Sequence, residues 1–234
     1  MTLMTKVPTL DEYWQQLEPH LPPFSPEERR VALALCQEVA KGRPVDEAQL
    51  GRALGISATE SRVILERPSI KCWVYRDELG RVLGFGGLAA ALMHHRFEVD
   101  GRMLSTWCAW DSLFIPEILG RPARVASPDP ESGELVRLVV TPERIESVEP
   151  AGAVVSFIMP DAQAFGSSNA NVITKFCHFI FFFASRSSGE RWVAKHPDTF
   201  LCSLDDAFVL AKRHNARNFG PELALHAQSQ ARAT

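Results

Sequence analysis

Apolar residues in the first ninety positions recur at helical spacing in three short stretches. The first begins at 25–28, where a serine, a proline and two glutamates form a capping signal, and it carries an apolar stripe toward Gly42. A second helix is predicted over 46–54. A third begins at a Ser-Ala-Thr-Glu capping box at 57–60 and runs toward Arg67.

The positions after the third helix predict two strands, at 71–75 and 81–85, around a polar turn. Three helices followed by a β-hairpin is the layout of a winged helix. We therefore expect residues 1–90 to form an N-terminal helical, winged-helix-like domain.

Beyond this region the pattern mixes helical and strand periods. Asp100-Gly101 is a strong two-residue hairpin signal between apolar segments on either side. A helix is predicted over 107–119, bent or restarted at Pro116. Further elements are expected as strands at 134–140 and 153–159 and as helices at 190–195 and 205–215.

An almost uninterrupted aromatic and aliphatic run at 176–184 predicts a central strand, because strands buried on both faces lose their alternation. The small polar residues of 162–171 predict a loop. The expected fold class is α+β. Residues 91–225 would form a mixed α/β catalytic core with a small antiparallel-rich sheet, and 226–234 a frayed tail.

The composition is that of a globular protein and excludes several classes. The 234 residues are 46% hydrophobic and 23% charged, with a net charge of -3, which gives no electrostatic basis for binding nucleic acid or an anionic membrane. No apolar run reaches the ~18 residues of a spanning helix, and the N-terminus lacks the pattern of a signal peptide. We expect a cytoplasmic, reducing location.

Five cysteines are scattered along the chain without a CxxC pair, so neither a disulfide framework nor a structural zinc site is expected. Any cysteine that acts chemically would do so as a thiol brought to its partners by folding. Three of them are interpreted as packing residues: Cys36, Cys72 and Cys202.

Cys108 and Asp111 lie three residues apart, and if 107–119 is helical they project from one face. Trp107 and Trp110 flank the thiol and predict a dry site, where burial raises the pKa of both the thiol and the carboxyl group. A carboxyl kept partly protonated near neutral pH can act as a general acid. The alternative is structural, with Cys108 as a small core residue and Asp111 as a cap.

Cys177 sits in the apolar 176–184 run, where a single cysteine is most often a packing residue. Its neighbour His178 would point to the opposite face of a strand and is interpreted as structural. His94 and His95 are interpreted as a surface turn. The Gly84–Gly87 cluster lacks dinucleotide-binding spacing and predicts a tight turn.

Several motifs together point to one family. Trp107-Cys108-Ala109-Trp110-Asp111 is followed by Glu-Pro-Ala-Gly at 149–152, and by Phe176-Cys177 leading into Phe-Phe-Ala-Ser at 182–185. The segments at 120–125 and 192–196 fit the same pattern. In this order the motifs closely resemble the organomercurial (alkylmercury) lyase family, over nearly the whole chain to about Asn215.

The resemblance implies an enzyme that cleaves the carbon–mercury bond of organomercurials to a hydrocarbon and Hg(II). Cys108 and Cys177 would be the two thiols and Asp111 the proton donor, all three contacting mercury, and Trp107, Trp110 and Phe176 would line the substrate pocket. No cofactor is implied, since mercury enters as substrate. The implied partners are the organomercurial, small thiols and mercuric reductase as acceptors of Hg(II).

Two positions depart from some members of the family. His178 stands where some relatives have a second cysteine, and Asp129, in the loop at 127–130, stands near where others carry one. Neither belongs to the implied catalytic set. The sequence does not indicate the preferred organic group, the oligomeric state or the route by which Hg(II) leaves.

Two further hypotheses belong to other classes. A soft-metal binder would use the two thiols without catalysis, but it has no need of Asp111. A winged-helix metal-responsive regulator would need uncompensated positive charge on its recognition helix. In the third predicted helix, Arg62 and Arg67 are balanced by Glu60 and Glu66.

Overall fold

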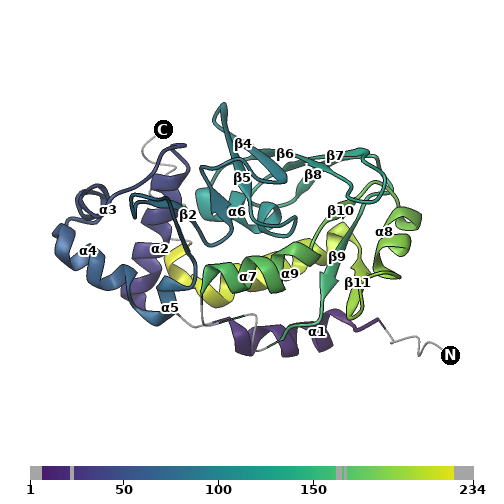
Figure 1. The fold of residues 1–234 in the computed structure, drawn as a ribbon, viewed down its shortest axis with the longest axis horizontal. Helices are drawn as coiled ribbons and strands as arrows, with labels where there is room; N and C mark the ends of the chain where they lie inside the picture. The colour runs from purple at the N-terminus through teal and green to yellow at the C-terminus, as the bar shows by residue number, and fades with distance from the viewer. Residues whose placement is uncertain (1–6, 22–23, 162–164, 166–167, 224–234) are drawn as a thin grey trace.

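The computed structural model describes residues 7–21, 24–161, 165 and 168–223 (Figure 1). Its helices are α1 (Leu10–Leu17), η1 (Glu18–His20), α2 (Pro26–Val39), α3 (Glu47–Leu54), α4 (Ala58–Leu65), α5 (Pro68–Lys71), α6 (Asp111–Leu119), α7 (Asn169–Lys175), η3 (Cys177–Phe179), α8 (Arg186–Val193) and α9 (Leu204–Asn218). Its strands are β1 (Val74–Arg76), β2 (Val82–Phe85), β3 (Leu88–Ala89), β4 (His95–Val99), β5 (Arg102–Thr106), β6 (Ala123–Pro128), β7 (Leu135–Val140), β8 (Ile145–Glu149), β9 (Val154–Ile158), β10 (Phe182–Phe183) and β11 (Thr199–Cys202).

The three N-terminal helices expected from the sequence are present as α2, α3 and α4. Capping boxes at Ser25, Asp46 and Ser57 begin them, each with the cap side chain accepting the N3 backbone N–H. Gly55 ends α3 with φ +71°, a left-handed conformation that glycine adopts without a Cβ penalty. These local signals predicted the helices correctly, because side chains within four residues pair with the free backbone N–H groups at each helix start.

The hairpin of β1 and β2 is also present, although Lys71 belongs to α5 instead of the first strand. This hairpin continues through β3 into the larger sheet. The winged-helix assignment and the boundary at residue 90 stay predictions.

The sheet expected to be small is large. Eight strands, all antiparallel, follow the order β1-β2-β3-β5-β4-β6-β7-β8, with the expected hairpin at Asp100-Gly101 joining β4 and β5. A second antiparallel sheet has the order β10-β9-β11. The architecture is therefore α+β as expected, but with a wide sheet that spans both halves of the chain.

The expected central strand at 176–184 is wrong. This run forms the 3-10 turn η3 and then β10, which pairs only with β9 at the edge of the second sheet. The Ser156 hydroxyl accepts the Phe181 N–H at 3.0 Å and donates to the Phe179 carbonyl at 2.7 Å, which fixes the irregular segment. A continuous apolar run indicates burial and does not by itself distinguish a strand from a buried turn.

The loop expected at 162–171 falls partly outside the described residues, and α7 begins within it at Asn169. The expected frayed tail, 226–234, also lies outside them. The last two helices, α8 and α9, begin earlier than the sequence suggested, after the N-caps Ser185 and Ser203.

The helices α3, α4 and α5 lie at one end of the molecule and α8 at the other, with α9 crossing the middle (Figure 1). Helix α9 contacts α6 on one side and α1 on the other. Tyr13 of α1 is fully buried, packs edge-on against Phe157 and Phe200, and donates to the Ile158 carbonyl at 3.1 Å. Segments from both ends of the chain therefore enclose one apolar core.

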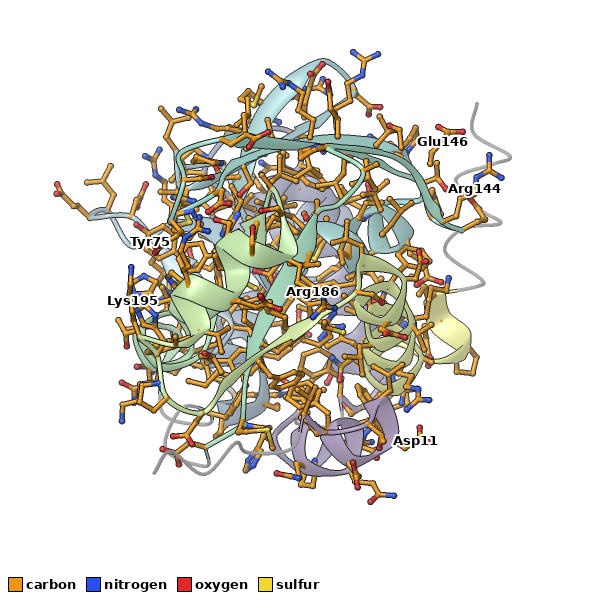
Figure 2. The ribbon with its side chains drawn as sticks, turned by 90° about the vertical axis from the view of Figure 1, so that its right-hand side faces the viewer. Asp11, Tyr75, Arg144, Glu146, Arg186 and Lys195 are labelled. Atoms are coloured by element: carbon orange, nitrogen blue, oxygen red, sulfur yellow. The ribbon has the colours of Figure 1, made fainter. Side chains whose placement is uncertain are left out.

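Charged side chains such as Asp11, Arg144, Glu146 and Lys195 lie at the periphery (Figure 2). Many are paired; for example, Arg144 lies 3.1 Å from Glu146. In the described part of the chain no helix is both long and apolar enough to cross a membrane.

Candidate active site

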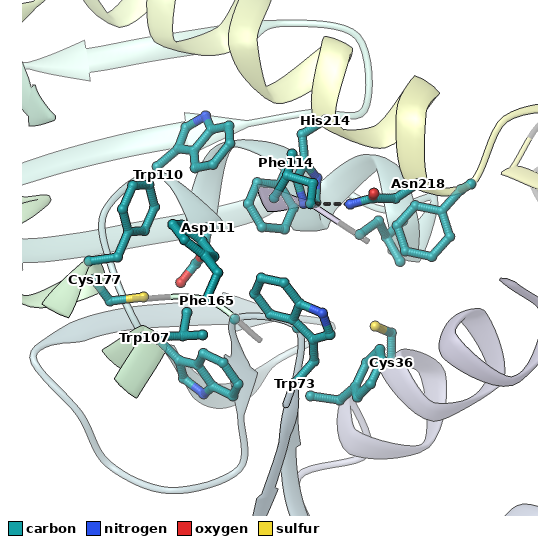
Figure 3. A pocket seen from close by; sticks show the side chains of 18 of the residues that line it. Cys36, Trp73, Trp107, Trp110, Asp111, Phe114, Phe165, Cys177, His214 and Asn218 are labelled. Atoms are coloured by element: carbon teal, nitrogen blue, oxygen red, sulfur yellow. Dashed lines mark hydrogen bonds between the residues drawn. The ribbon is translucent and has the colours of Figure 1, made fainter. Parts of the chain in front are cut away.

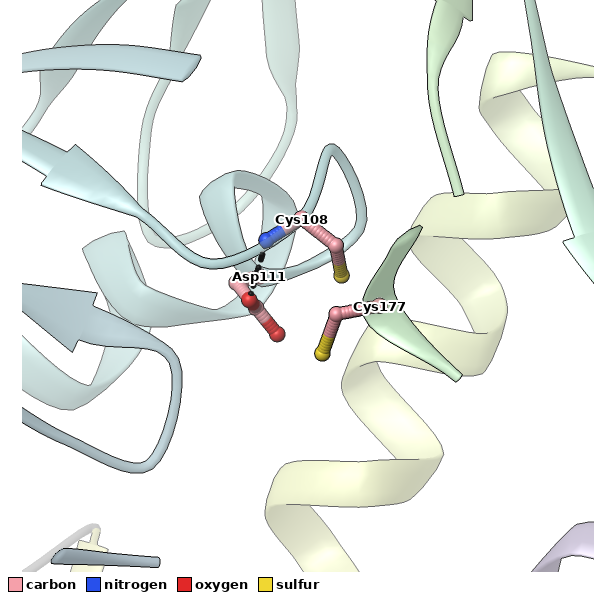
Figure 4. A group of neighbouring side chains, drawn as sticks. All are labelled: Cys108, Asp111 and Cys177. Carbon is pink, nitrogen blue, oxygen red and sulfur yellow. Dashed lines mark hydrogen bonds between the residues drawn. The ribbon is translucent and has the colours of Figure 1, made fainter. Parts of the chain in front are cut away.

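Cys108, Asp111 and Cys177 converge in the interior (Figure 4). Their Sγ and carboxylate oxygen atoms all lie within 4.8 Å of one another, and the residues are 1%, 6% and 4% exposed. Within the described residues this is the one group of three or more His, Cys, Asp or Glu side chains close enough to hold a metal ion. The three candidates chosen from the sequence thus form one cluster.

The first two residues meet for a different reason from the one expected. The helix predicted from 107 begins only at Asp111, and residues 107–110 form a turn. Asp111 Oδ2 accepts the Cys108 N–H at 2.7 Å, so the carboxylate caps the turn that presents the thiol. The sequence spacing was correct, but an aspartate-capped turn brings the groups together instead of one face of a helix.

A backbone contact fixes the distant third residue. The Ala109 N–H, next to Cys108, donates to the Ile180 carbonyl at 3.1 Å, in the segment that follows Cys177. Thr106 donates its hydroxyl to the Cys108 carbonyl at 2.8 Å. The two cysteine segments, about seventy residues apart in sequence, are therefore attached to each other beside the thiols.

Burial controls the protonation of the cluster. It raises the pKa of Asp111 from 3.8 to about 7, although hydrogen bonds from Cys108 and the Trp107 backbone act in the opposite direction. Burial, the hydrogen bond with Cys177 and the Asp111 charge raise the pKa of Cys108 well above its ordinary value. The Cys108 hydrogen bond lowers the pKa of Cys177, but burial and the Asp111 charge outweigh it and raise that pKa too.

An apolar pocket opens onto Asp111 and Cys177 (Figure 3). Its wall is mostly apolar and aromatic, as in sites that take small organic molecules. The structure places all three expected wall residues on this pocket: Trp107, Trp110 and Phe176.

Other residues on the pocket wall were missed or misjudged from the sequence. Cys36, interpreted as a packing residue, lines the pocket as well as the core, whereas Cys72 and Cys202 are buried away from it. Gly87, His214 and Asn218 also line it. Of these, only the Gly84–Gly87 cluster gave a signal in the sequence: Gly86 and Gly87 form the predicted turn, whereas Gly84 lies in β2.

Gly87 lies against the carboxyl group of Asp111. Its φ is +97°, and a Cβ added there would lie 2.5 Å from Asp111 Cγ. Its carbonyl also accepts the Trp107 N–H at 2.8 Å. A glycine at this position lets the backbone approach the carboxyl group and hold the turn that carries Cys108.

Gly87→Ala is expected to lower the turnover rate by about 100-fold, because the added methyl group must displace the Asp111 side chain. Gly86→Ala is the matched control: Gly86 also has positive φ, at +53°, but nothing lies within 4 Å of its added Cβ. Steady-state assays of both variants, with thermal melts, would separate displacement of the carboxyl group from backbone strain. Equal activity in the two variants would contradict a positioning role for Gly87.

The remaining candidates lie outside the cluster. His178 is exposed in η3, and its interpretation as a structural residue stays a prediction. The expected surface turn at His94 and His95 is wrong for His95, which is buried in β4 with its Nδ1 2.8 Å from Ser127 Oγ. Asp129 is buried and accepts the Ala184 N–H at 2.9 Å, so it anchors the start of α8.

Two buried thiols and an acid of raised pKa, beside an aromatic pocket, are groups that could hold a soft metal and supply a proton next to it. A model of the alkylmercury lyase family matches residues 88–215. The chain belongs to the alkylmercury lyase family.

Individual relatives agree with that assignment. The chain is 39% identical to an alkylmercury lyase of Staphylococcus epidermidis over 78% of this chain and 80% of that protein. It is 41% identical to one of Streptomyces lividans over 76% and 78%, and 36% identical to one of Bacillus cereus over 78% and 79%. A crystal structure of the mercury-bound form of MerB2 shares the fold, with a TM-score of 0.68 at 20% identity over 93% of this chain and 98% of that one.

Proposed function

We propose that this protein is an alkylmercury lyase that cleaves the carbon–mercury bond of organomercurials by protonolysis, using Cys108, Cys177 and Asp111. One observation carries the assignment of residues: two thiols and one carboxyl group have their reactive atoms within 4.8 Å of one another in a buried site. The rest of the described chain offers no other group of three or more His, Cys, Asp or Glu side chains close enough to hold a metal ion.

The first step is transfer of the organomercurial from a solution thiol to the protein. Both cysteines are held as thiols by their raised pKa values, so each must lose a proton as it bonds to mercury. The departing solution thiol takes one of these protons. Asp111, ionised at and above its pKa of about 7, takes the other from the neighbouring thiol.

The second step breaks the carbon–mercury bond. Thiolates are soft ligands that bind mercury strongly, and two of them increase the electron density on the attached carbon. The electron pair of the carbon–mercury bond becomes the new carbon–hydrogen bond, and Asp111 supplies the proton. The hydrocarbon leaves, and Hg(II) stays bonded to Cys108 and Cys177.

The aromatic wall supports both steps. It excludes water, which preserves the proton on Asp111 and strengthens interactions within the site. It also makes no specific contact with a methyl, ethyl or phenyl group. We therefore expect broad tolerance for simple hydrocarbon groups and strict dependence on a soft metal.

Release of Hg(II) completes the cycle. Small thiols in solution, with mercuric reductase as a further acceptor, would remove the metal by exchange at the two cysteines. No cofactor is required by this scheme. All five cysteines are free thiols, which fits a reducing cytoplasm as the proposed location.

The test is headspace gas chromatography of purified protein incubated with methylmercury and excess small thiol. Methane release in proportion to the protein is expected, because protonolysis converts the methyl group to methane. Denatured protein with the same thiol is the control. Stoichiometric uptake of mercury without methane would instead indicate a soft-metal binder.

The two alternative functions are not favoured. A binder leaves the buried acid at the thiols without a role. For a DNA-binding regulator, Arg62 of α4 lies 3.8 Å from Glu47, and Arg67 after it lies 2.6 Å from Glu27, so the positive charge of the helix is locally neutralised. A salt-sensitive shift of duplex DNA by the protein would revive that hypothesis.

A further inference from the structure

The substrate pocket extends well past the reacting groups. The indole of Trp73 lies between Asp111 and Cys36, with its nitrogen on the side of Cys36 (Figure 3). The pocket is also lined by Cys36, His214 and Asn218. The part of the pocket next to these three residues is here called the deep end.

Unpartnered polar atoms gather in this pocket. Six buried side-chain nitrogen or oxygen atoms in the described chain lack a hydrogen-bond partner, and three of them belong to pocket-lining residues. They are Trp73 Nε1, Trp107 Nε1 and Asn218 Oδ1. Because a buried polar group without a partner is costly, such a concentration within one cavity indicates a polar ligand.

A chain of hydrogen bonds fixes which atom of Asn218 is left over. It begins at Asn215, whose side-chain nitrogen donates to the Phe114 carbonyl at 2.9 Å and to a Glu117 carboxylate oxygen at 2.7 Å. Both partners are acceptors, so the Asn215 amide cannot be turned around. Its oxygen therefore faces His214 Nδ1, at 3.2 Å, and this ring nitrogen must carry the proton.

The opposite ring nitrogen is then an acceptor. Burial lowers the pKa of His214 to about 4, so the ring is neutral near pH 7 and Nε2 has no proton. Asn218 must present its NH₂ group to Nε2, at 2.9 Å. Its carbonyl oxygen, the remaining atom, is the unpartnered one, so the deep end offers a hydrogen-bond acceptor. Glu117 sets the orientation of this acceptor through the hydrogen bonds that link it to Asn215, His214 and Asn218 in turn.

We propose that the deep end is a subsite for a hydroxyl group carried by the organic part of the substrate, which donates a hydrogen bond to Asn218 Oδ1. A hydroxyl group fits because its O–H can donate to this acceptor. A carboxylate has no proton to donate and would face the Asn218 oxygen, so it is rejected. The proposal rests on the proposed function, since it names the organomercurials that the same pocket selects.

Substrate selectivity tests the subsite. For the wild-type protein, kcat/KM for 3- or 4-hydroxyphenylmercury should exceed that for phenylmercury by at least about tenfold, and 4-carboxyphenylmercury should be the poorest of the series. Asn218→Leu, of similar size without the acceptor, should bring the hydroxyphenyl-to-phenyl ratio close to one. An unchanged ratio in this variant would overturn the proposal.

The ratio separates recognition from structural damage, since a distorted pocket changes both substrates together. Phe219→Leu is the matched control, because Phe219 lines the same pocket without a polar atom, and its ratio should equal that of the wild type.

A mercury-free measurement keeps this inference distinct from the proposed function. Phenol and toluene binding, followed by ligand-observed NMR, should show tighter binding of phenol to the wild type and no difference in Asn218→Leu. Equal binding of the two to the wild type would overturn the subsite even if cleavage is observed. Loss of cleavage with preserved phenol preference would overturn the proposed function alone.

Discussion

Cys108→Ser and Cys177→Ser are each expected to abolish methane release, with a loss in kcat/KM on the order of 10⁴-fold or more. A hydroxyl group is a hard ligand that remains protonated near neutral pH, so it cannot replace a thiolate on mercury. Both residues are buried, and serine is of similar size, so the fold should survive. Headspace gas chromatography with methylmercury, alongside circular dichroism, makes the measurement.

Cys72→Ser is the matched control, because Cys72 is buried but does not line the pocket. It should retain activity. The double variant at 108 and 177 should be no slower than either single variant, since groups that act as a unit lose their effect together. Substantial methane release by either single variant would refute the two-thiol assignment.

Asp111→Asn is expected to block turnover while making the protein more stable above pH 7. The asparagine cannot deliver a proton to carbon, although its side-chain oxygen can still accept the Cys108 N–H. Mercury uptake should persist because both thiols remain. Activity equal to that of the wild type would contradict the assignment of Asp111 as proton donor.

The stability effect follows from the raised pKa. Folding raises the pKa of Asp111 from 3.8 to about 7, so the folded protein holds this proton more tightly than the unfolded chain. The contribution of this proton to the free energy of unfolding is fully present below 3.8, the pKa of Asp111 in the unfolded chain. It is lost as pH rises through about 7, the pKa in the folded protein. A difference of ~3 pKa units corresponds to about 4 kcal/mol, which Asp111→Asn should recover at pH 8 and not at pH 4. Urea unfolding at the two pH values measures it.

Asp129→Asn is a control that should change the stability of the protein in the opposite direction. Burial alone would raise the pKa of Asp129, but hydrogen bonds from the backbone N–H groups of Ala184, Glu131 and Ser132 outweigh it and lower the pKa. Its stabilising effect is therefore present above the unfolded pKa and is lost as pH falls through the lower folded value. Asp129→Asn should destabilise the protein at pH 8. Two variants that shift stability in the same direction would contradict this account of the buried charges.

The elements predicted correctly are those whose signals are local. Ser25 and Ser57 begin helices, and Asp100-Gly101 turns a hairpin, because the groups that satisfy one another lie within a few residues. The family motifs likewise identified Cys108, Asp111 and Cys177 as candidates. For the helix caps and the hairpin, a short window of sequence contains the interacting partners.

The errors fall where hydrogen bonds, and not apolar periodicity, decide the local structure. Residues 176–184 form a turn and a short edge strand because Ser156 of β9 holds the Phe179 and Phe181 backbone, a contact across more than twenty residues. The helix expected from 107 starts at Asp111 because that carboxylate caps the preceding turn. Neither choice can be read from apolar periodicity, which reports burial and not hydrogen-bond partners.

The sequence by itself determined the kinds of groups available: two thiols in aromatic surroundings, one carboxyl group beside the first, and the order of motifs that defines the family. Only the tertiary structure decided that these groups meet within 4.8 Å, that burial raises the pKa of Asp111 to about 7, and that Gly87 and Asn218 belong to the pocket. The physical reason is that proximity, desolvation and the orientation of an amide are properties of what surrounds a residue, and most of those neighbours come from remote parts of the chain.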